Sequence, residues 1–283
     1  MANPKRVDPA GYGVLLDEVA RVTRLAEGPE GVRRILRTVF LADAIPILDL
    51  ARGAGLPVPV VAAVRGELEK RGLLKRQGGV MLTQAGLEVV RGLLGLSCRR
   101  PFSRPLYPPL PEDFSGALNR MGEICDGRPT VDVTLDQSHV TPETALRRAL
   151  YLYANDALEG RDILILGDDD LTSLAMGLVS EFLGLRVRRV VVLECDGRLV
   201  DYLRDAAGKA GQSPEVIWHD LREALPGELA GRFDVFLTDP PYTLEGLDLF
   251  VSRGVSALRP EVGKQGYVCF GQRTPGEMAA TIG

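Results

Sequence analysis

The feature that most limits how this chain can fold is an alternation of apolar runs with helical segments from residue 162 onward. The runs are DILILGD (162–168), VRRVVVLEC (187–195), EVIWHD (215–220) and FDVFLTD (233–239), and GYVCFG (266–271) follows. Strands that are apolar on both faces are typical of a parallel sheet covered by helices on both sides. The sequence therefore predicts an α/β fold, with a Rossmann-like parallel-sheet domain over residues 115–283.

Residues 1–100 predict a smaller helical domain, and a linker with five prolines (101–114) separates it from the sheet. Helical patterns over 31–43 and 46–57 precede a third helix, a tight hairpin at Gly78-Gly79 and a further helix. This order resembles a winged helix, so we expect a winged-helix-like α(+β) domain. Winged helices often read DNA with the third helix, but they also serve as dimerisation or lid modules.

The end of the sequence predicts an unfinished domain. EMAATIG (277–283) has the composition of a helix that follows the last strand and stops abruptly. A sheet of this type usually needs one or two further strands, so we expect the domain to be incomplete at its C-terminus.

Charge is unevenly divided along the chain. Residues 1–100 carry a net charge of +6 and the remainder −10, which together make −4. An acidic catalytic half suits a small cationic substrate better than nucleic acid. Four scattered cysteines indicate reduced thiols in a cytoplasmic protein. With only two histidines we expect no His-rich zinc site, and no apolar run reaches membrane-spanning length. Scarce asparagine and abundant arginine fit either a hot habitat or coding bias.

The segment ILILGDDDLTS (163–173) combines a strand, one glycine and three aspartates at the start of a helix. A nucleotide fold normally carries a glycine-rich loop here, so that backbone amides can meet a phosphate. Asp168, Asp169 and Asp170 would repel a phosphate after Gly167, and they favour a cation. One aspartate could instead serve as a helix cap, but three adjacent carboxylates repel one another, which favours function.

Two further acids follow the next strands. Glu194 ends the second strand, near the position of the acid that grips a ribose diol in nucleotide folds. Asp220 ends the third strand, where it could accept a hydrogen bond from an adenine amino group. Each is a weak indication alone, because acids commonly cap helices after strands.

The fourth strand ends in DPPY (239–242). Neither proline offers an N–H and each fixes φ, so the pair stops the ladder and stiffens the exit. Asp239 and Tyr242 are then presented at a carboxyl edge, where open parallel sheets bind ligands. The simpler alternative is a Pro-Pro turn that only ends the strand.

These motifs resemble a known family. Glu194, Asp220 and DPPY resemble class I adenosylmethionine-dependent transferases, and DPPY is best known in amino-methyltransferases. GDDD with DPPYT, behind a winged-helix-like region and the segment VDVTLDQSHVTPET, resembles the N4-bis(aminopropyl)spermidine synthases over about residues 30–275. The resemblance implies transfer of an aminopropyl group from decarboxylated S-adenosylmethionine to the N4 secondary amine of spermidine, with no prosthetic group or metal and as a homodimer.

The same resemblance implies roles for individual residues. Asp168, Asp169, Asp170 and Asp239 would be catalytic, and either one of the triad or Asp239 would accept or orient the amine proton. Gly167, Gln137, Glu194 and Asp220 would bind the donor. Asp169, Asp170, Asp239, Pro240 and Tyr242 would contact the polyamine, with Asp239 and the Pro240 carbonyl holding the amine.

Two other functions remain open from the sequence. An amino-methyltransferase acting on nucleic-acid bases would use the winged helix as a DNA reader, but the acidic catalytic half opposes it. A regulator that senses an adenosyl ligand would have no need of DPPY.

Overall fold

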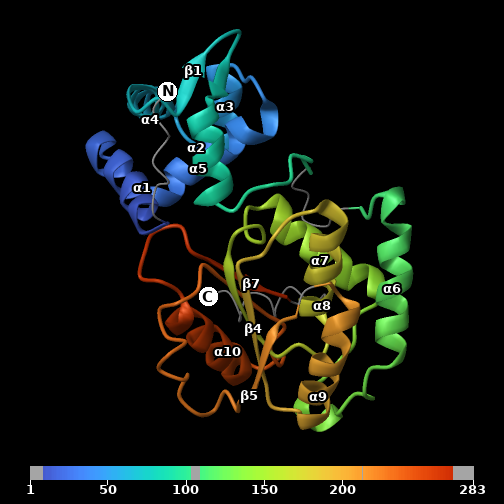
Figure 1. Cartoon of the computed structure of the whole chain (residues 1–283). Helices are drawn as coiled ribbons and strands as arrows, with labels where there is room; N and C mark the ends of the chain where they lie inside the picture. The colour runs from blue at the N-terminus through green and yellow to red at the C-terminus, as the bar shows by residue number, and fades with distance from the viewer. Residues whose placement is uncertain (1–8, 103–108, 212, 270–283) are drawn as a thin grey trace. The chain divides into compact units, whose positions relative to one another are not determined.

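The computed structural model describes residues 9–102, 109–211 and 213–269 (Figure 1). The chain divides into two compact units: Met1–Phe102 with Glu261–Gly263, and Ser103–Pro260 with Lys264–Gly283. The helix expected at 277–283 and part of the proline-rich segment lie outside the described residues. Within those residues no single helix has both the length and the apolarity to cross a bilayer; α3 (Ile47–Ala54) and α4 (Val58–Lys70) pass that test only as a pair bent by 104°.

The first unit contains five helices and one hairpin among its described residues. In chain order these are α1 (Pro9–Thr23), α2 (Gly28–Ala42), α3, α4, β1 (Leu74–Arg76), β2 (Val80–Leu82) and α5 (Gln84–Gly92). The antiparallel β1–β2 hairpin turns at Gly78, whose φ of 71° favours glycine. The predicted helix order and hairpin are confirmed, whereas α1 was not predicted.

The core of this unit explains the helical periodicity. Ile35, Leu36, Val61, Val64 and Leu68 are fully buried in one cluster that also takes residues from the other elements of the unit. The hydrophobic stripes of α2 and α4 therefore contribute to one shared core.

The second unit is built on a five-stranded parallel sheet, which confirms the predicted α/β architecture. Its strands are β3 (Asp162–Leu166), β4 (Arg189–Glu194), β5 (Glu215–Trp218), β6 (Val235–Thr238) and β7 (Gln265–Val268). Their order is β5-β4-β3-β6-β7. Each residue of β3 and β6 is buried, as expected for strands that are covered on both faces.

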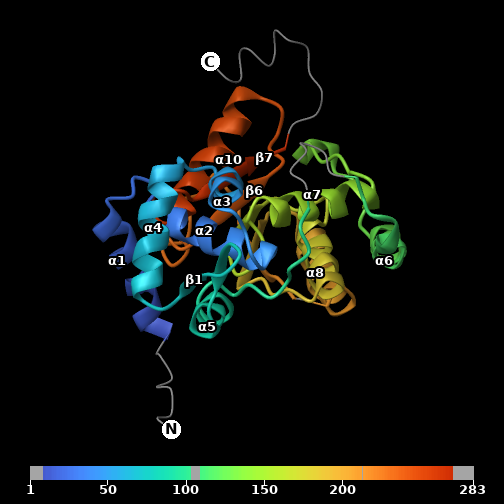
Figure 2. The ribbon, with the colours of Figure 1, turned by 90° about the horizontal axis from the view of Figure 1, so that it is seen from above.

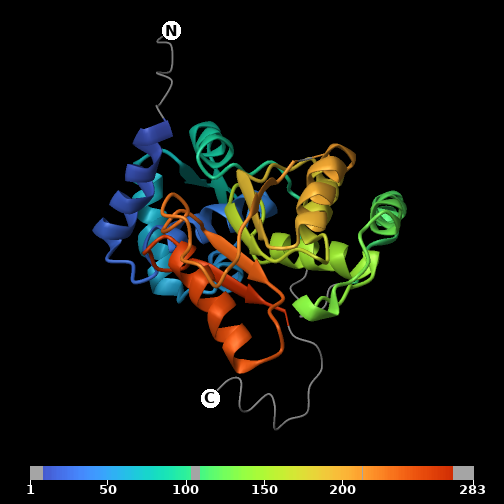
Figure 3. The same cartoon turned by 90° about the horizontal axis from the view of Figure 1, so that it is seen from below.

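Helices cover the two faces of this sheet. Among the described residues of this unit the α-helices are α6 (Ser115–Asp126), α7 (Pro142–Ala154), α8 (Thr172–Leu183), α9 (Gly197–Ala206) and α10 (Leu244–Ala257). Figure 1, with the turned views of Figure 2 and Figure 3, shows α8 and α10 on opposite sides of the strands. Helix α6 was not predicted from the sequence.

The strand order creates a topological switch point. From β3 the chain proceeds outward through β4 and β5, and it then returns to place β6 on the other side of β3. The connections that leave β3 and β6 consequently turn to opposite faces, which opens a crevice at the carboxyl ends of these strands. The GDDD and DPPY motifs follow these two strands.

Candidate active site

A pocket of about 510 Å³ lies at this carboxyl edge. Its lining contains six residues that the sequence assigned to ligand binding: Gln137, Gly167, Asp169, Glu194, Asp220 and Asp239. The four other predicted site residues, Asp168, Asp170, Pro240 and Tyr242, are adjacent in sequence but are not among the lining residues. The pocket thus brings together acids that come from the ends of four different strands or loops.

Glu194 is buried at the end of β4, where it anchors two loops. Its Oε2 accepts a hydrogen bond of 2.9 Å from the Asp168 N–H. Its Oε1 accepts from the N–H groups of Cys195 and Asp196 at 2.8 and 2.9 Å. The carboxylate therefore fixes the loop after β3 against the loop after β4, and it also borders the pocket.

The three adjacent aspartates point in different directions. Asp168 is only 2% exposed, and its carboxylate accepts from the N–H groups of Thr172 (2.7 Å) and Ser173 (3.2 Å) at the start of α8. Burial raises its pKa to about 8, against the lowering effect of these hydrogen bonds from Ser173 and Thr172. Asp168 therefore has the geometry of a helix cap, which was the simpler alternative for one aspartate of the triad.

Asp169 is the member of the triad that lines the pocket. Its Oδ2 accepts a hydrogen bond of 3.0 Å from the Ser138 N–H. Burial, and next the charge of Asp170, raise the pKa of Asp169 to about 7. A cation in the pocket would offset both effects, because it favours the ionised carboxylate.

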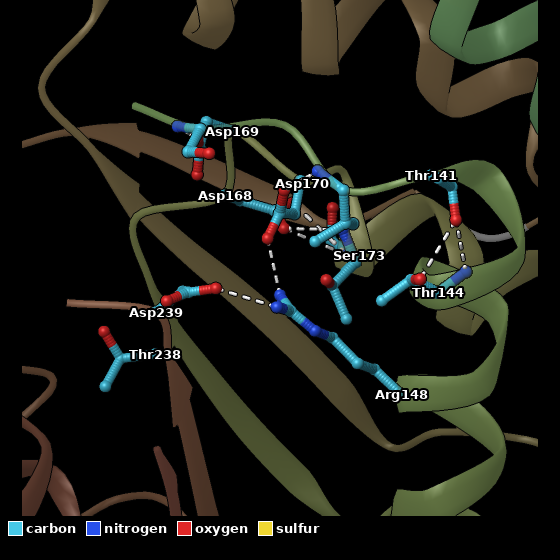
Figure 4. A network of polar contacts seen from close by, with 12 residues as sticks. Thr141, Thr144, Arg148, Asp168, Asp169, Asp170, Ser173, Thr238 and Asp239 are labelled. Atoms are coloured by element: carbon cyan, nitrogen blue, oxygen red, sulfur yellow. Dashed lines mark hydrogen bonds and ion pairs between the residues drawn. The ribbon is translucent and has the colours of Figure 1, made fainter. Parts of the chain in front are cut away.

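Asp170 and Asp239 share one arginine, as Figure 4 shows. One terminal nitrogen of Arg148 lies 2.5 Å from Asp170 Oδ2, and the other lies 2.7 Å from Asp239 Oδ2. The second Asp170 oxygen accepts a hydrogen bond of 2.7 Å from the Val140 N–H. The acid after β3 and the acid after β6 are therefore joined by a guanidinium that α7 supplies.

The DPPY segment begins directly after the last residue of β6. β6 ends at Thr238, whose carbonyl accepts a hydrogen bond of 2.8 Å from the Cys269 N–H. Asp239 follows with its side chain 21% exposed, and Pro240 is buried. Burial raises the pKa of Asp239, while Arg148 and a hydrogen bond to the Tyr242 side chain lower it.

A short segment of residues 132–140, which we call the strap, connects the loops around the pocket. Gln137 accepts from the Asp132 N–H at 2.7 Å and donates to Asp196 Oδ2 at 3.1 Å. Asp136 Oδ2 accepts from the Tyr242 N–H at 3.1 Å. With the Ser138 and Val140 hydrogen bonds, the strap contacts the loops after β3, β4 and β6.

Asp220 borders the pocket on the β5 side. Hydrogen bonds from the Arg222 side chain and backbone lower the pKa of Asp220 to about 2, so this acid is ionised at any physiological pH. Trp218 also lines the pocket and is 59% exposed, and its indole N–H donates to the Cys195 carbonyl at 2.9 Å.

Among the described residues, no group of three histidine, cysteine or acidic side chains is arranged to hold a metal ion. The triad does not form such a group because its first carboxylate caps α8, its second borders the pocket and its third pairs with Arg148.

Sequence reasoning missed Arg148 and most of the strap. Arg148 lies inside an amphipathic helix, where an arginine is ordinarily a solvated surface residue. One available indication was its place in TPETALRRALYLYA, where it shares a helix face with apolar residues three and four positions away.

Comparison with known proteins identifies the family. Residues 116–277 match the branched-chain polyamine synthase A C-terminal domain. An uncharacterized protein of Methanocaldococcus jannaschii is 39% identical over 88% of this chain and 64% of its own length. The N(4)-bis(aminopropyl)spermidine synthase of Thermus thermophilus is 37% identical over 89% of this chain and 71% of its own.

A solved structure agrees with this assignment. A branched-chain polyamine synthase mutein from Thermus thermophilus, in complex with N4-aminopropylspermidine and 5'-methylthioadenosine, is 31% identical, with a TM-score of 0.52 over 97% of this chain and 76% of that one. The chain spans 64% of the first relative's length, so its relatives are longer proteins. Both the matched domain and the identity to these relatives show that this chain belongs to the branched-chain polyamine synthase family.

Proposed function

We propose that this chain is a transferase that moves the aminopropyl group of decarboxylated S-adenosylmethionine to the N4 secondary amine of spermidine. The product would be a branched polyamine, and the co-product would be 5'-methylthioadenosine. Two lines of support are the family membership and the two ligands in the complex of the Thermus thermophilus mutein, N4-aminopropylspermidine and 5'-methylthioadenosine.

The observation that carries the proposal is one pocket that is bordered by two groups of carboxylates. Glu194 and Asp220 border it after β4 and β5, where nucleotide folds hold an adenosyl group, and Asp169 and Asp239 border it after β3 and β6. The donor is a sulfonium with a free amine, and spermidine is a protonated triamine. Two polycations can share a site only where carboxylates offset their repulsion.

The reaction needs no nucleophilic enzyme residue. The neutral N4 lone pair forms a bond to the propyl carbon next to sulfur, and the C–S bond breaks as its electrons return to the sulfonium. The new ammonium proton then passes to a carboxylate or to water. Alignment of the amine with the C–S bond, together with removal of its first proton, supplies the rate enhancement.

We assign roles to residues within this proposal. Asp239 and the Pro240 carbonyl orient the attacking amine, and Tyr242 shapes the wall beside them. Asp169 faces the amines of donor and acceptor. For Asp168 we propose a structural contribution to catalysis, through the α8 cap that sets the direction of the loop.

The donor-binding residues follow the same logic. Glu194 is proposed to accept from the ribose hydroxyls next to Gly167, and Asp220 from the adenine amino group. Gln137 would hold the strap over the donor through its bonds to Asp132 and Asp196.

Incubation of the chain with spermidine and either S-adenosylmethionine or its decarboxylated form tests the proposal. We expect aminopropylated spermidine and 5'-methylthioadenosine from the decarboxylated donor alone, because Asp169 would repel the carboxylate of the intact donor. Mass spectrometry distinguishes the two products. A methylated amine or base formed from S-adenosylmethionine would instead support the amino-methyltransferase alternative.

We further propose that residues 1–100 are a winged-helix-like domain, 101–114 a linker and 115–283 the catalytic domain. The hairpin and the helix order of the first unit support the winged helix.

A cytoplasmic location is proposed because all four cysteines are free thiols. A homodimer is proposed from the family resemblance, and light scattering of the purified chain tests it.

A further inference from the structure

Arg148 has no role in the proposed reaction so far. It is not among the residues that line the pocket, but it pairs with Asp239, which is one of them. It belongs to α7 and its side chain is 18% exposed. It forms ion pairs with Asp170 and Asp239, which belong to loops that follow different strands. Figure 4 shows the guanidinium between these two carboxylates.

The charged and titratable groups around this arginine come from every element that meets at the site. Asp170 after β3, Asp239 after β6 and Cys269 after β7 act on Arg148 directly. The charged or titratable neighbours of these groups are Asp168, Asp169, Glu194 at the end of β4, Tyr242, Arg128, and His139 within the strap. Negative groups dominate this set. A guanidinium stays protonated at any pH of interest, so Arg148 is a fixed positive charge among them.

A fixed cation at this position has two consequences for protons. It favours the ionised form of Asp239, whose burial has the opposite effect. It also reduces the negative potential at an amine next to Asp239, and a less negative potential makes an ammonium lose its proton more readily. Both consequences favour the one state that can react, in which the acid is ionised and the amine is neutral.

We propose that Arg148 is a positioning residue that sets the pH range of the transferase, because its charge eases proton loss from the acceptor amine and holds Asp239 as an oriented carboxylate. This inference rests on the proposed function. It also has a cost for binding, since the same positive charge weakens the attraction of the pocket for a polycation.

The weaker binding of a polycation distinguishes the proposed role of the Arg148 charge from a purely structural role of its side chain. If Arg148 only braced two loops, its loss would lower turnover at every pH and weaken binding of the acceptor. If its charge matters, its loss lowers turnover mainly at neutral pH and leaves the KM for spermidine unchanged or lower.

Arg148→Gln tests the charge, and pH profiles of kcat and KM are measured on the full chain. We expect kcat at pH 7 to fall about tenfold and the midpoint of the acid limb to rise by about one pH unit, the size expected for one nearby charge in a partly buried site. Arg148→Lys keeps the charge and is expected to keep the midpoint. Arg147→Gln, which removes the neighbouring arginine that pairs with Glu143 on the same helix, is the matched control.

Arg148→Lys also covers the case in which Arg148→Gln does not fold. The ammonium keeps one positive charge but lacks the two-pronged geometry that pairs with both carboxylates, so any fall in kcat should occur at every pH while the midpoint stays at that of the wild type. A midpoint that is displaced in Arg148→Lys, or one that is unchanged in Arg148→Gln, overturns the inference alone. A wild-type chain that transfers no aminopropyl group overturns the proposed function and this inference with it.

Discussion

Asp239 is the residue where the proposed chemistry meets the structure most directly. It follows the buried strand β6, borders the pocket and shares Arg148 with Asp170. A simple strand terminator would need none of these contacts. The two prolines after Asp239 restrict its backbone, and the ion pair with Arg148 holds its carboxylate in place.

Asp239→Asn should lower turnover at neutral pH about 10²-fold or more, the usual loss for a positioned general base. The amide keeps the shape but cannot attract or accept a proton. Raising the pH should recover part of the rate, because more spermidine is then already neutral. Steady-state kinetics measure this effect, and Asp248→Asn on the exposed surface of α10 is the control. Near wild-type turnover at pH 7 would show that the DPPY motif only ends the strand and takes no part in catalysis.

Glu194→Gln should weaken binding of 5'-methylthioadenosine by about 1–3 kcal/mol, because a charged hydrogen-bond acceptor for the ribose diol is lost. Spermidine binding should change much less, and titration calorimetry measures both ligands. Glu215→Gln at the amino end of β5, 51% exposed, is the matched control. Equal losses for both ligands would indicate that Glu194 only anchors the loops after β3 and β4.

At the scale of elements, α8 packs closely against the segment that follows α9. Gly177 on α8 faces the Ala210 carbonyl, and an added Cβ would lie 2.4 Å from that oxygen. Gly122 on α6 has nothing within 4 Å of the same position. A side chain is therefore excluded by close packing at Gly177 but not at Gly122.

Gly177→Ala should lower the free energy of unfolding by about 1–3 kcal/mol, because the backbone of Ala210 has to move. Gly122→Ala should instead raise it by about 0.5–1 kcal/mol, since alanine is the better helix former. Urea unfolding followed by Trp218, the single tryptophan, reports on the unit that contains both helices. Equal effects of the two substitutions would contradict the close approach at Gly177.

The strap shows how much a segment with little regular structure can organise. Within residues 132–140 the structure has one short 3-10 helix, Val133–Leu135, yet the backbone N–H groups of Ser138 and Val140 reach Asp169 and Asp170. These two hydrogen bonds satisfy one carboxylate oxygen of each acid. The strap therefore lowers the electrostatic cost of placing three aspartates in succession.

At the scale of the whole molecule, the free chain should be less stable at neutral than at mildly acidic pH. The pKa of Asp169 is about 7 when folded and near 3.8 in the unfolded chain. A raised pKa contributes stability that is complete below the lower value and is lost as pH rises through the higher one. Without cationic ligands, ionisation of Asp169 therefore lowers the free energy of unfolding at physiological pH.

Asp169→Asn should gain stability relative to the wild type, by about 1–2 kcal/mol between pH 5 and pH 7.5, because the amide does not ionise. Urea unfolding at the two pH values, again followed by Trp218, measures this change. Asp201→Asn on α9, whose side chain is 81% exposed, is the control. A gap between wild type and Asp169→Asn that is the same at both pH values would show that the pocket does not raise the pKa of Asp169.

Much of the molecule follows from local sequence. The apolar runs at 162–168 and 233–239 predict buried strands, and a glycine, Gly184, ends the helix that follows the first of them. Parallel strands have their carboxyl ends at one edge, so Gly167, Glu194, Asp220 and Asp239 had to meet there once the strands were recognised. These inferences depend only on periodicity and on a rule of topology.

Tertiary structure alone decided what each acid does. Asp168, Asp169 and Asp170 are chemically identical neighbours, yet the folded chain directs one toward α8, one toward the pocket and one toward Arg148. Arg148 and Asp239 are 91 residues apart. No local pattern encodes such a pair, because an arginine on an amphipathic helix acquires its partner only when the packing of α7 directs it toward the edge of the sheet.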